Sequence, residues 1–224
     1  MKIIARIKSD FPEKFGIPRQ SGLVEELSAK IIFEEEYANP DAVRGLEDFS
    51  HIWLIWQFSK AVRDDWSPTV RPPRLGGNER MGVFATRSPF RPNPIGLSCV
   101  RLDRVEIDPK LGPVIHVRGA DLMDGTPIYD IKPYVPYADC VEGAVGGFAA
   151  EKPEAKLNVT VSEELAKTVP ADKLAALEGV LAQDPRPAYQ KDPSRAYGLS
   201  FGGYEVRFTV KENELTVVSI DKKD

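Results

Sequence analysis

The sequence has few of the residues that usually mark metal sites, disulfides or membrane spans. It contains only two cysteines, Cys99 and Cys140, and two histidines, His51 and His116. These four give neither zinc-ligand spacing nor a disulfide framework. The longest unbroken apolar run, residues 52–56, is far shorter than the ~20 residues of a membrane span. The N-terminal MKIIARIKSD lacks the apolar segment of a signal peptide. We therefore expect a cytoplasmic protein without a metal or membrane partner.

Several common enzyme motifs are also missing. No glycine-rich G-x-G-x-x-G motif joins a strand to a helix, no P-loop lysine motif occurs, and no G-x-S-x-G elbow is present. These absences argue against the common dinucleotide-binding, P-loop and α/β-hydrolase folds. The length of 224 residues, with 42% hydrophobic and 29% charged residues, fits a folded chain of one large domain or one domain plus a small one.

The charge is unevenly distributed. The net charge of −4 hides a basic block at residues 66–101, which holds six arginines, no lysine and one acid, Glu79. Arginine forms forked hydrogen bonds with oxyanions, so this block favours recognition of phosphate or carboxylate groups. The alternative is a solvated loop whose arginines pair with the acidic flanking segments.

The pattern of short strands predicts a mainly β protein. Proline- and glycine-rich turns separate the strand candidates, and these strands do not alternate with long helices, which argues against a doubly wound α/β sheet. We predict a β-barrel or sandwich at residues 1–140, a linker at 141–156 and a small α+β domain at 157–224. The expected strands are 2–7, 29–33, 49–58, 97–107, 113–118, 157–161, 203–210 and 214–220, and the expected helices are 40–48, 163–167 and 173–183.

Three polar stretches stand out as candidate binding segments. The first is residues 18–20, a polar triplet in a proline-containing loop. The second is residues 87–96, whose prolines restrict the backbone and would present Arg87, Arg91 and Asn93 in fixed directions. The third is residues 121–134, in which a tight turn offers backbone groups to a ligand, unless it is an ordinary turn between strands.

Two long motifs resemble a known family. Residues 70–98 (VRPPRLGGNERMGVFATRSPFRPNPIGLS) and 121–139 (DLMDGTPIYDIKPYVPYAD) closely resemble the TsaA-like (TrmO) family of S-adenosylmethionine-dependent tRNA adenosine N6-methyltransferases. The resemblance extends to EKFGIPRQSGLV and ANPDAVRGLEDFSHIWLI, and LAQDPRPAYQKD matches the family's smaller second domain. It implies a homodimeric β-barrel enzyme with a non-Rossmann fold. This enzyme would methylate N6 of threonylcarbamoyl-adenosine beside the tRNA anticodon.

The resemblance also implies the residues of the cofactor site. Where the family often has His-Gln, this chain has Ser59 and Lys60. The implied S-adenosylmethionine contacts are Pro18, Arg19, Gln20, Ser59, Lys60, Arg87, Leu97, Asp124, Gly125, Thr126 and Pro127. Since the methyl group is already electrophilic in this cofactor, the protein mainly has to align the reactants.

Acceptor and RNA contacts complete the hypothesis. Asp130 and Tyr134 are our candidates for removing the proton of the acceptor nitrogen. Phe90, Tyr134 and Tyr189 are candidates for stacking on loop bases. The predicted contacts to the tRNA anticodon arm are Arg71, Arg74, Arg80, Arg91, Asn93, Asp184, Arg186 and Tyr189. Two alternatives stay open: a non-catalytic RNA-binding β-barrel, and a methyltransferase acting on a small molecule.

Overall fold

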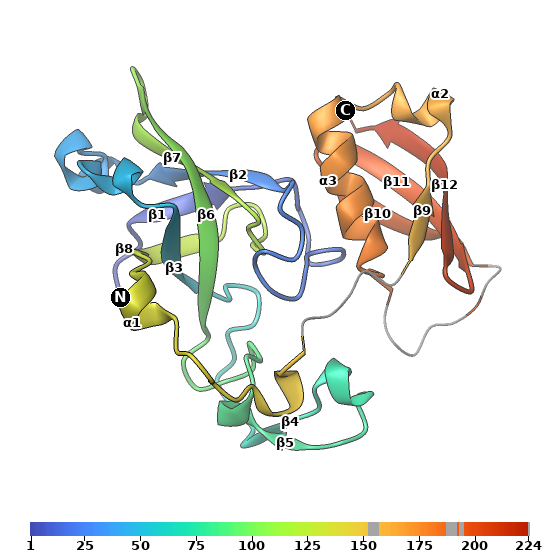
Figure 1. Ribbon diagram of the computed structural model, residues 1–224, viewed down its shortest axis with the longest axis horizontal. Coiled ribbons are helices and arrows are strands. Elements are labelled where there is room, and N and C mark those ends of the chain that lie inside the picture. The colour runs from blue at the N-terminus through green and yellow to red at the C-terminus, as the bar shows by residue number, and fades with distance from the viewer. Residues whose placement is uncertain (152–156, 187–191, 193–194, 224) are drawn as a thin grey trace.

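The computed structural model describes residues 1–151, 157–186, 192 and 195–223. Figure 1 shows two β structures side by side, with an arm and a helical segment extending from the first. The predicted mainly β fold is confirmed, because strands dominate both parts and helices are few and short.

The N-terminal part is a closed barrel of six strands in the order β1-β2-β7-β6-β3-β8. Along β3, inward-facing Ile52, Leu54 and Trp56 alternate with half-buried residues, which is the period-two pattern of a strand with one face in a core. The strands are β1 (Ala5–Lys8), β2 (Ser28–Phe33), β3 (His51–Gln57), β6 (Ile95–Asp108), β7 (Gly112–Arg118) and β8 (Pro127–Pro133).

Short helical turns connect β2 to β3. The helix expected at 40–48 is replaced by two 3₁₀ helices, because the chain leaves helical geometry at Arg44 and Gly45 adopts a left-handed φ of 81° before the second one begins. The expected cap is present, since the Asn39 side chain accepts a hydrogen bond of 2.9 Å from the Asp41 N–H. The three turns are η1 (Glu35–Tyr37), η2 (Pro40–Val43) and η3 (Leu46–Asp48).

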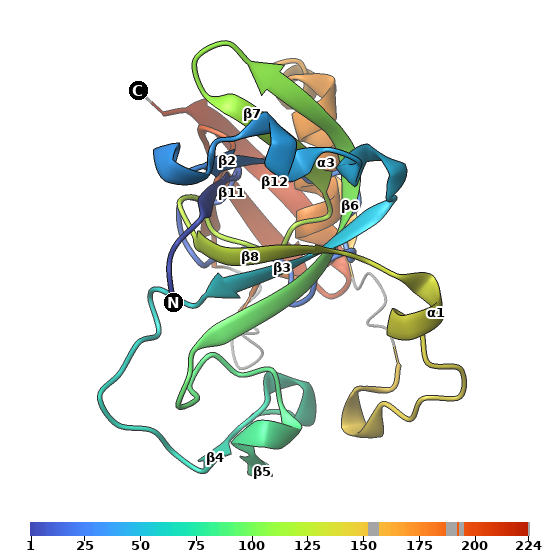
Figure 2. The same ribbon diagram turned by 90° about the vertical axis from the view of Figure 1, so that its left-hand side faces the viewer.

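An arm of residues 58–94 leaves the barrel between β3 and β6. It carries the small hairpin β4 (Thr69–Val70) and β5 (Met81–Gly82) and projects away from both sheets in two orthogonal views (Figures 1 and 2). Its 3₁₀ turns are η4 (Pro73–Leu75) and η5 (Val83–Ala85). After β8 the chain continues through α1 (Pro136–Asp139) and η6 (Gly147–Ala149).

The C-terminal part is a four-stranded sheet covered by one helix. Its strand order is β10-β11-β12-β9, and β9 runs parallel to β12. The helix α3 (Ala171–Ala182) buries Ala176, Leu177, Val180 and Leu181 against it. The other elements are α2 (Glu163–Ala166), β9 (Asn158–Thr160), β10 (Tyr197–Phe201), β11 (Tyr204–Lys211) and β12 (Glu214–Lys222).

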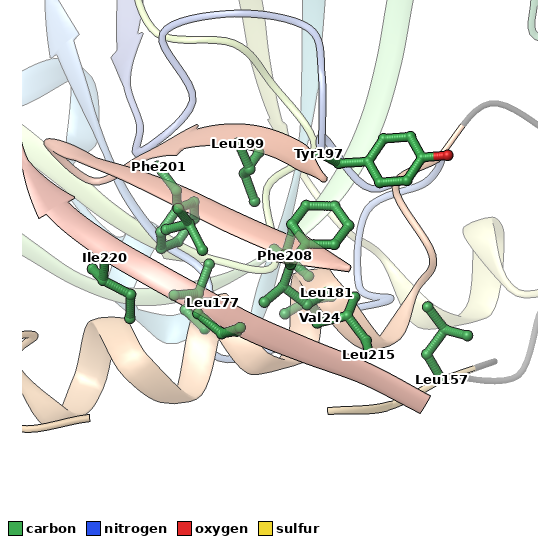
Figure 3. Close-up of a cluster of buried hydrophobic side chains, with 14 of the residues drawn as sticks. Val24, Leu157, Leu177, Leu181, Tyr197, Leu199, Phe201, Phe208, Leu215 and Ile220 are labelled. Atoms are coloured by element: carbon green, nitrogen blue, oxygen red, sulfur yellow. The ribbon is translucent and has the colours of Figure 1, made fainter. Parts of the chain in front are cut away.

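Two hydrophobic cores hold these parts together. The first fills the barrel. The second lies between α3 and the C-terminal sheet, but it also contains Phe11, Val24 and Leu27 from the loop between β1 and β2. Figure 3 shows Val24 among side chains of the C-terminal sheet and helix. The second core is therefore built from residues on both sides of the segment 141–156 that we predicted to be a linker.

Candidate active site

Four segments meet at one end of the barrel. The end of β3 pairs with the start of β6, where Trp56 lies opposite Gly96, and with the start of β8, where Trp56 lies opposite Ile128. The loop between β1 and β2, residues 9–27, reaches the same end, since Lys14 Nζ donates a hydrogen bond of 3.2 Å to the Lys60 carbonyl. These four segments thus gather polar groups around the mouth of the barrel.

The three polar stretches singled out in the sequence lie together here. Arg87 Nη1 donates a 2.6 Å hydrogen bond to Gln20 Oε1, which joins the arm to the β1–β2 loop. The Asp124 N–H donates to the Phe11 carbonyl at 2.8 Å, which joins the turn before β8 to the same loop. Segments separated by up to 115 positions, such as Ser9 and Asp124, therefore share one region.

The turn at residues 124–127 differs from our expectation that its N–H groups face a ligand. The Gly125 N–H donates to the Ile7 carbonyl at 2.9 Å, and the Thr126 N–H donates to the Met123 carbonyl at 3.2 Å. With the Asp124 N–H also bonded, the turn is locked to β1 and its loop. What remains for a ligand is open space beside Gly125, where an added Cβ would meet no atom within 4 Å.

A polar chain inside the barrel supports this end. Trp56 Nε1–H donates to Ser98 Oγ at 3.0 Å, and the Ser98 hydroxyl donates to Asp121 Oδ1 at 2.6 Å. Burial raises the pKa of Asp121 above its usual range, against the opposing effects of the Ser98 hydrogen bond and the Arg87 charge. Gly96 makes room for the Trp56 indole, because any Cβ there would overlap the ring.

Sequence reasoning did not single out Trp56 or Ser98, and it included Gly96 only as the last residue of the stretch 87–96. A glycine inside a strand often marks close approach of a neighbouring group, and this signal points to Gly96. Nothing in the sequence pairs a serine in β6 with an aspartate that follows β7.

The remaining predicted cofactor contacts occupy different positions around the mouth. Ser59 and Lys60 are exposed directly after β3. Pro18 and Pro127 are buried, whereas Arg19 is exposed. Leu97 lies on the outer barrel surface opposite Ile55 and is 50% exposed.

The two candidate bases lie on the outside of the barrel. Asp130 pairs in register with Ile55 and forms an ion pair of 3.1 Å with Lys132. Tyr134 follows β8 at the opposite barrel end, where its ring centroid lies 5.9 Å from that of Trp53. The seven residues of β8 span roughly 20 Å, so a single chain does not bring Tyr134 to the turn at 124–127.

The predicted RNA contacts of the arm are mostly accessible. Arg71 is exposed, Arg80 donates to Thr69 Oγ1 at 3.2 Å, and Arg91 donates to the Thr86 carbonyl at 3.1 Å. Arg74 donates to the Glu151 carbonyl, and Asn93 is exposed in the turn before β6. The Phe90 ring is 40% exposed, and the Arg63 guanidinium lies 4.1 Å from its centroid.

The two described RNA-contact candidates of the C-terminal domain, unlike the arginines of the arm, pair with each other. Arg186 Nε donates a hydrogen bond of 2.8 Å to Asp184, and these side chains are only 12% and 21% exposed. This pairing raises the pKa of Arg186, and each charge is already compensated by the other. Tyr189 lies outside the described residues.

Two negative findings concern the described ranges alone. Within them, no group of three or more histidine, cysteine, aspartate or glutamate side chains is arranged to hold a metal ion. In the same ranges, no helix has the length and apolar character needed to cross a membrane.

Comparisons with known proteins agree with this architecture. A model of the tRNA-methyltransferase O N-terminal domain matches residues 6–140, and a model of the TrmO C-terminal domain matches residues 154–223. The chain is 43% identical to a protein of Escherichia coli (strain K12) named tRNA (adenine(37)-N6)-methyltransferase, over 98% of this chain and 97% of that one. It is also 43% identical to a putative S-adenosylmethionine-dependent methyltransferase of Pseudomonas aeruginosa, over 92% and 90% of the two chains.

A solved structure has the same fold. The crystal structure of TrmO from Pseudomonas aeruginosa superposes with a TM-score of 0.80 at 34% identity, covering 98% of this chain and 96% of that one. Both domains, and not the barrel alone, therefore have counterparts in these proteins. The chain belongs to the tRNA-methyltransferase O (TrmO) family.

Proposed function

We propose that this protein is a tRNA (adenine(37)-N6)-methyltransferase that uses S-adenosylmethionine. The observation that carries the proposal is the meeting of the β1–β2 loop, Arg87 and the turn at 124–127 at one barrel end. The similarity to methyltransferases over nearly the whole chain supports the same reaction.

The groups at the barrel mouth fit the parts of this cofactor. Arg87 and Arg19 supply cationic donors for its carboxylate, and Gln20 supplies an amide that both donates and accepts. The open space beside Gly125 admits a group close to the backbone. Pro18 and Pro127 line the region with rigid apolar rings. We therefore propose that these residues hold the cofactor.

The chain's contribution to the reaction is alignment. The bound cofactor supplies an electrophilic methyl group on a sulfonium. In this proposal the residues at the barrel mouth would hold the cofactor so that its methyl group faces the acceptor nitrogen, and orientation of this kind can lower a barrier by up to ~7–11 kcal/mol. Transfer of that methyl group to the nitrogen would leave the sulfur as a neutral thioether and would require a group of the protein or solvent to accept the N–H proton. A carboxylate is suited to accept that proton, and Asp130 is our candidate.

We further propose a homodimer. Asp130 lies on the outer barrel face, so it reaches the reacting nitrogen only where this face of one copy meets the mouth of another. Large apolar residues exposed on the arm and after β8 support association: Trp66 is 52% exposed, Phe84 is 73% exposed and Tyr137 is 91% exposed.

The tRNA substrate fits the charge of the arm. Accessible arginines, among them Arg71 and Arg80, can neutralise phosphates, and this contribution weakens as salt rises. We propose that residues 58–94 bind the anticodon arm of the tRNA, and that Arg74, Arg91 and Asn93 contribute to this contact. We propose a cytoplasmic location, because a tRNA-modifying enzyme works where its substrate is.

A transfer assay tests this function. The folded protein is mixed with methyl-labelled S-adenosylmethionine and with tRNA that either carries or lacks threonylcarbamoyl-adenosine. We expect label in the modified tRNA, with a rate that falls as salt rises. Tight tRNA binding without transfer would favour a non-catalytic RNA-binding barrel. Salt-insensitive transfer to a small molecule would favour the other alternative.

A further inference from the structure

The β1–β2 loop, residues 9–27, contacts both parts of the molecule. Its middle carries the triplet Pro18-Arg19-Gln20 that we propose to bind the cofactor. On one side it is bonded to the barrel: Ser9 Oγ donates to the Leu122 carbonyl at 2.8 Å, and the Gly22 N–H donates to the Gly119 carbonyl at 2.9 Å. These bonds fix where the loop leaves and rejoins the barrel.

The other side of the loop is part of the C-terminal core. Phe11 is 1% exposed, and its ring packs edge-on against Phe201 of β10 at a centroid distance of 5.3 Å. Val24 is 2% exposed and lies against Gly179 of α3, where an added Cβ would come within 2.7 Å of Val24 Cγ1. Figure 3 shows Val24, Phe201 and Leu199 in this one cluster.

The triplet lies between these anchors. Gly16, two residues before Pro18, has a φ of +88° and packs so closely on Leu199 of β10 that a side chain there would collide with it. Val24 anchors the chain four residues after Gln20. The loop backbone at the cofactor triplet is therefore held on both sides by contacts with the C-terminal sheet and helix.

A polar contact completes this interface. Lys173 of α3 forms an ion pair with Asp10 at 2.5 Å, and the two side chains are 31% and 15% exposed. The Gly202 N–H, in the turn after β10, donates to the Asp10 carbonyl at 2.8 Å. Partial burial makes this ion pair stronger and more specific in geometry than a pair fully in solvent.

We propose that the C-terminal domain positions the cofactor triplet, with Lys173 and Asp10 as positioning residues for the methyl-transfer site. Free loops of this length sample many conformations, and ordering them costs conformational entropy. When only a fraction of molecules has the binding-competent loop, the apparent Kd rises in inverse proportion to that fraction. The C-terminal core keeps this fraction high without touching the cofactor. This inference rests on the proposed function of the triplet.

The test compares Lys173→Met, Asp10→Asn and the double variant with the wild-type full chain. The probe is S-adenosylhomocysteine, the demethylated cofactor, with calorimetric Kd values measured at a temperature where every variant is folded. We expect each single variant to weaken binding about threefold to tenfold. The double variant should be no weaker than the singles, because all three lose the same pair. KM for the methyl donor should rise while kcat at saturating donor stays unchanged.

The matched control is Lys223→Met. It removes a lysine of the same C-terminal domain that pairs with Glu205 at 2.9 Å and has no hydrogen bond or ion pair to residues 9–27 among the described contacts. We expect its Kd to equal that of the wild type. Amide hydrogen exchange in residues 9–27 should accelerate in Lys173→Met and stay unchanged in the control.

Two results would overturn the proposal. The first is faster exchange in residues 9–27 of Lys173→Met with a wild-type Kd, because the loop would then be loosened without consequence for the cofactor. The second is unchanged exchange and unchanged Kd in both single variants, because the pair would then not hold the loop. A wild-type protein that does not bind the probe would instead contradict the proposed function.

Discussion

Arg87 is the side chain whose replacement separates binding from folding most clearly. It is exposed, and its guanidinium donates a hydrogen bond to Gln20 at 2.6 Å, so it contributes little to the packed core. Surface changes of this kind usually alter stability by less than ~0.5 kcal/mol, which is roughly 2 °C or less in Tm for a chain of this size.

The effect on cofactor binding should be much larger. A hydrogen bond to a charged group is worth about 1.5–3 kcal/mol, and each ~1.4 kcal/mol is tenfold in Kd. We therefore expect Arg87→Ala to raise the Kd for S-adenosylmethionine roughly 10- to 150-fold in a calorimetric titration. Arg80→Ala, on the arm, serves as the comparison: it should leave this Kd unchanged and reduce the salt dependence of tRNA binding. A large fall in Tm for Arg87→Ala with normal affinity would refute the reasoning and make Arg87 structural.

Three further predictions concern the barrel. Gly96→Ala places a methyl group against the Trp56 indole; overpacking of ~1–3 kcal/mol should lower the Tm by roughly 2–12 °C in a thermal melt, and an unchanged Tm would contradict the close contact. Burial raises the pKa of Asp121 in the folded protein. The contribution of Asp121 to the free energy of unfolding is therefore fully present below the carboxyl's ordinary pKa and is lost as pH rises through its pKa in the folded protein. Asp121→Asn should therefore gain Tm relative to the wild type as pH rises above the carboxyl's ordinary pKa, and a Tm difference that does not change with pH would argue against a raised pKa. Asp130→Asn should lower kcat and leave the cofactor Kd unchanged; an unaltered kcat would remove Asp130 from the mechanism.

Much of the barrel was predictable because its strands have strong local signals. The sequence HIWLIWQ predicts a strand because it is rich in aromatic and β-branched residues, whereas its alternation of buried and half-buried residues is not visible in an unbroken apolar run. The C-terminal hairpin of β11 and β12 was also predicted close to its observed bounds. The strand β10 was not predicted, because it follows a proline-rich stretch and gains its place only by pairing with β11.

The candidate site was only partly predictable. Motifs identified Gln20, Arg87 and Asp124, but no local signal indicates that the Asp124 N–H would be bonded to the Phe11 carbonyl. The sharing of Phe11 and Val24 with the C-terminal core was equally hidden, since both lie far along the chain from their partners. Hydrophobic residues in a loop predict burial, but they do not identify the surface that covers them.

Mass spectrometry of tRNA nucleosides tests the central claim most directly. The wild-type protein is incubated with methyl-labelled S-adenosylmethionine and tRNA that carries threonylcarbamoyl-adenosine, and the tRNA is then digested. We predict one labelled methyl group on N6 of that nucleoside and none on the other bases, with the label greatly reduced for Arg87→Ala. Folded protein that binds the cofactor but leaves every tRNA nucleoside unlabelled would contradict the account.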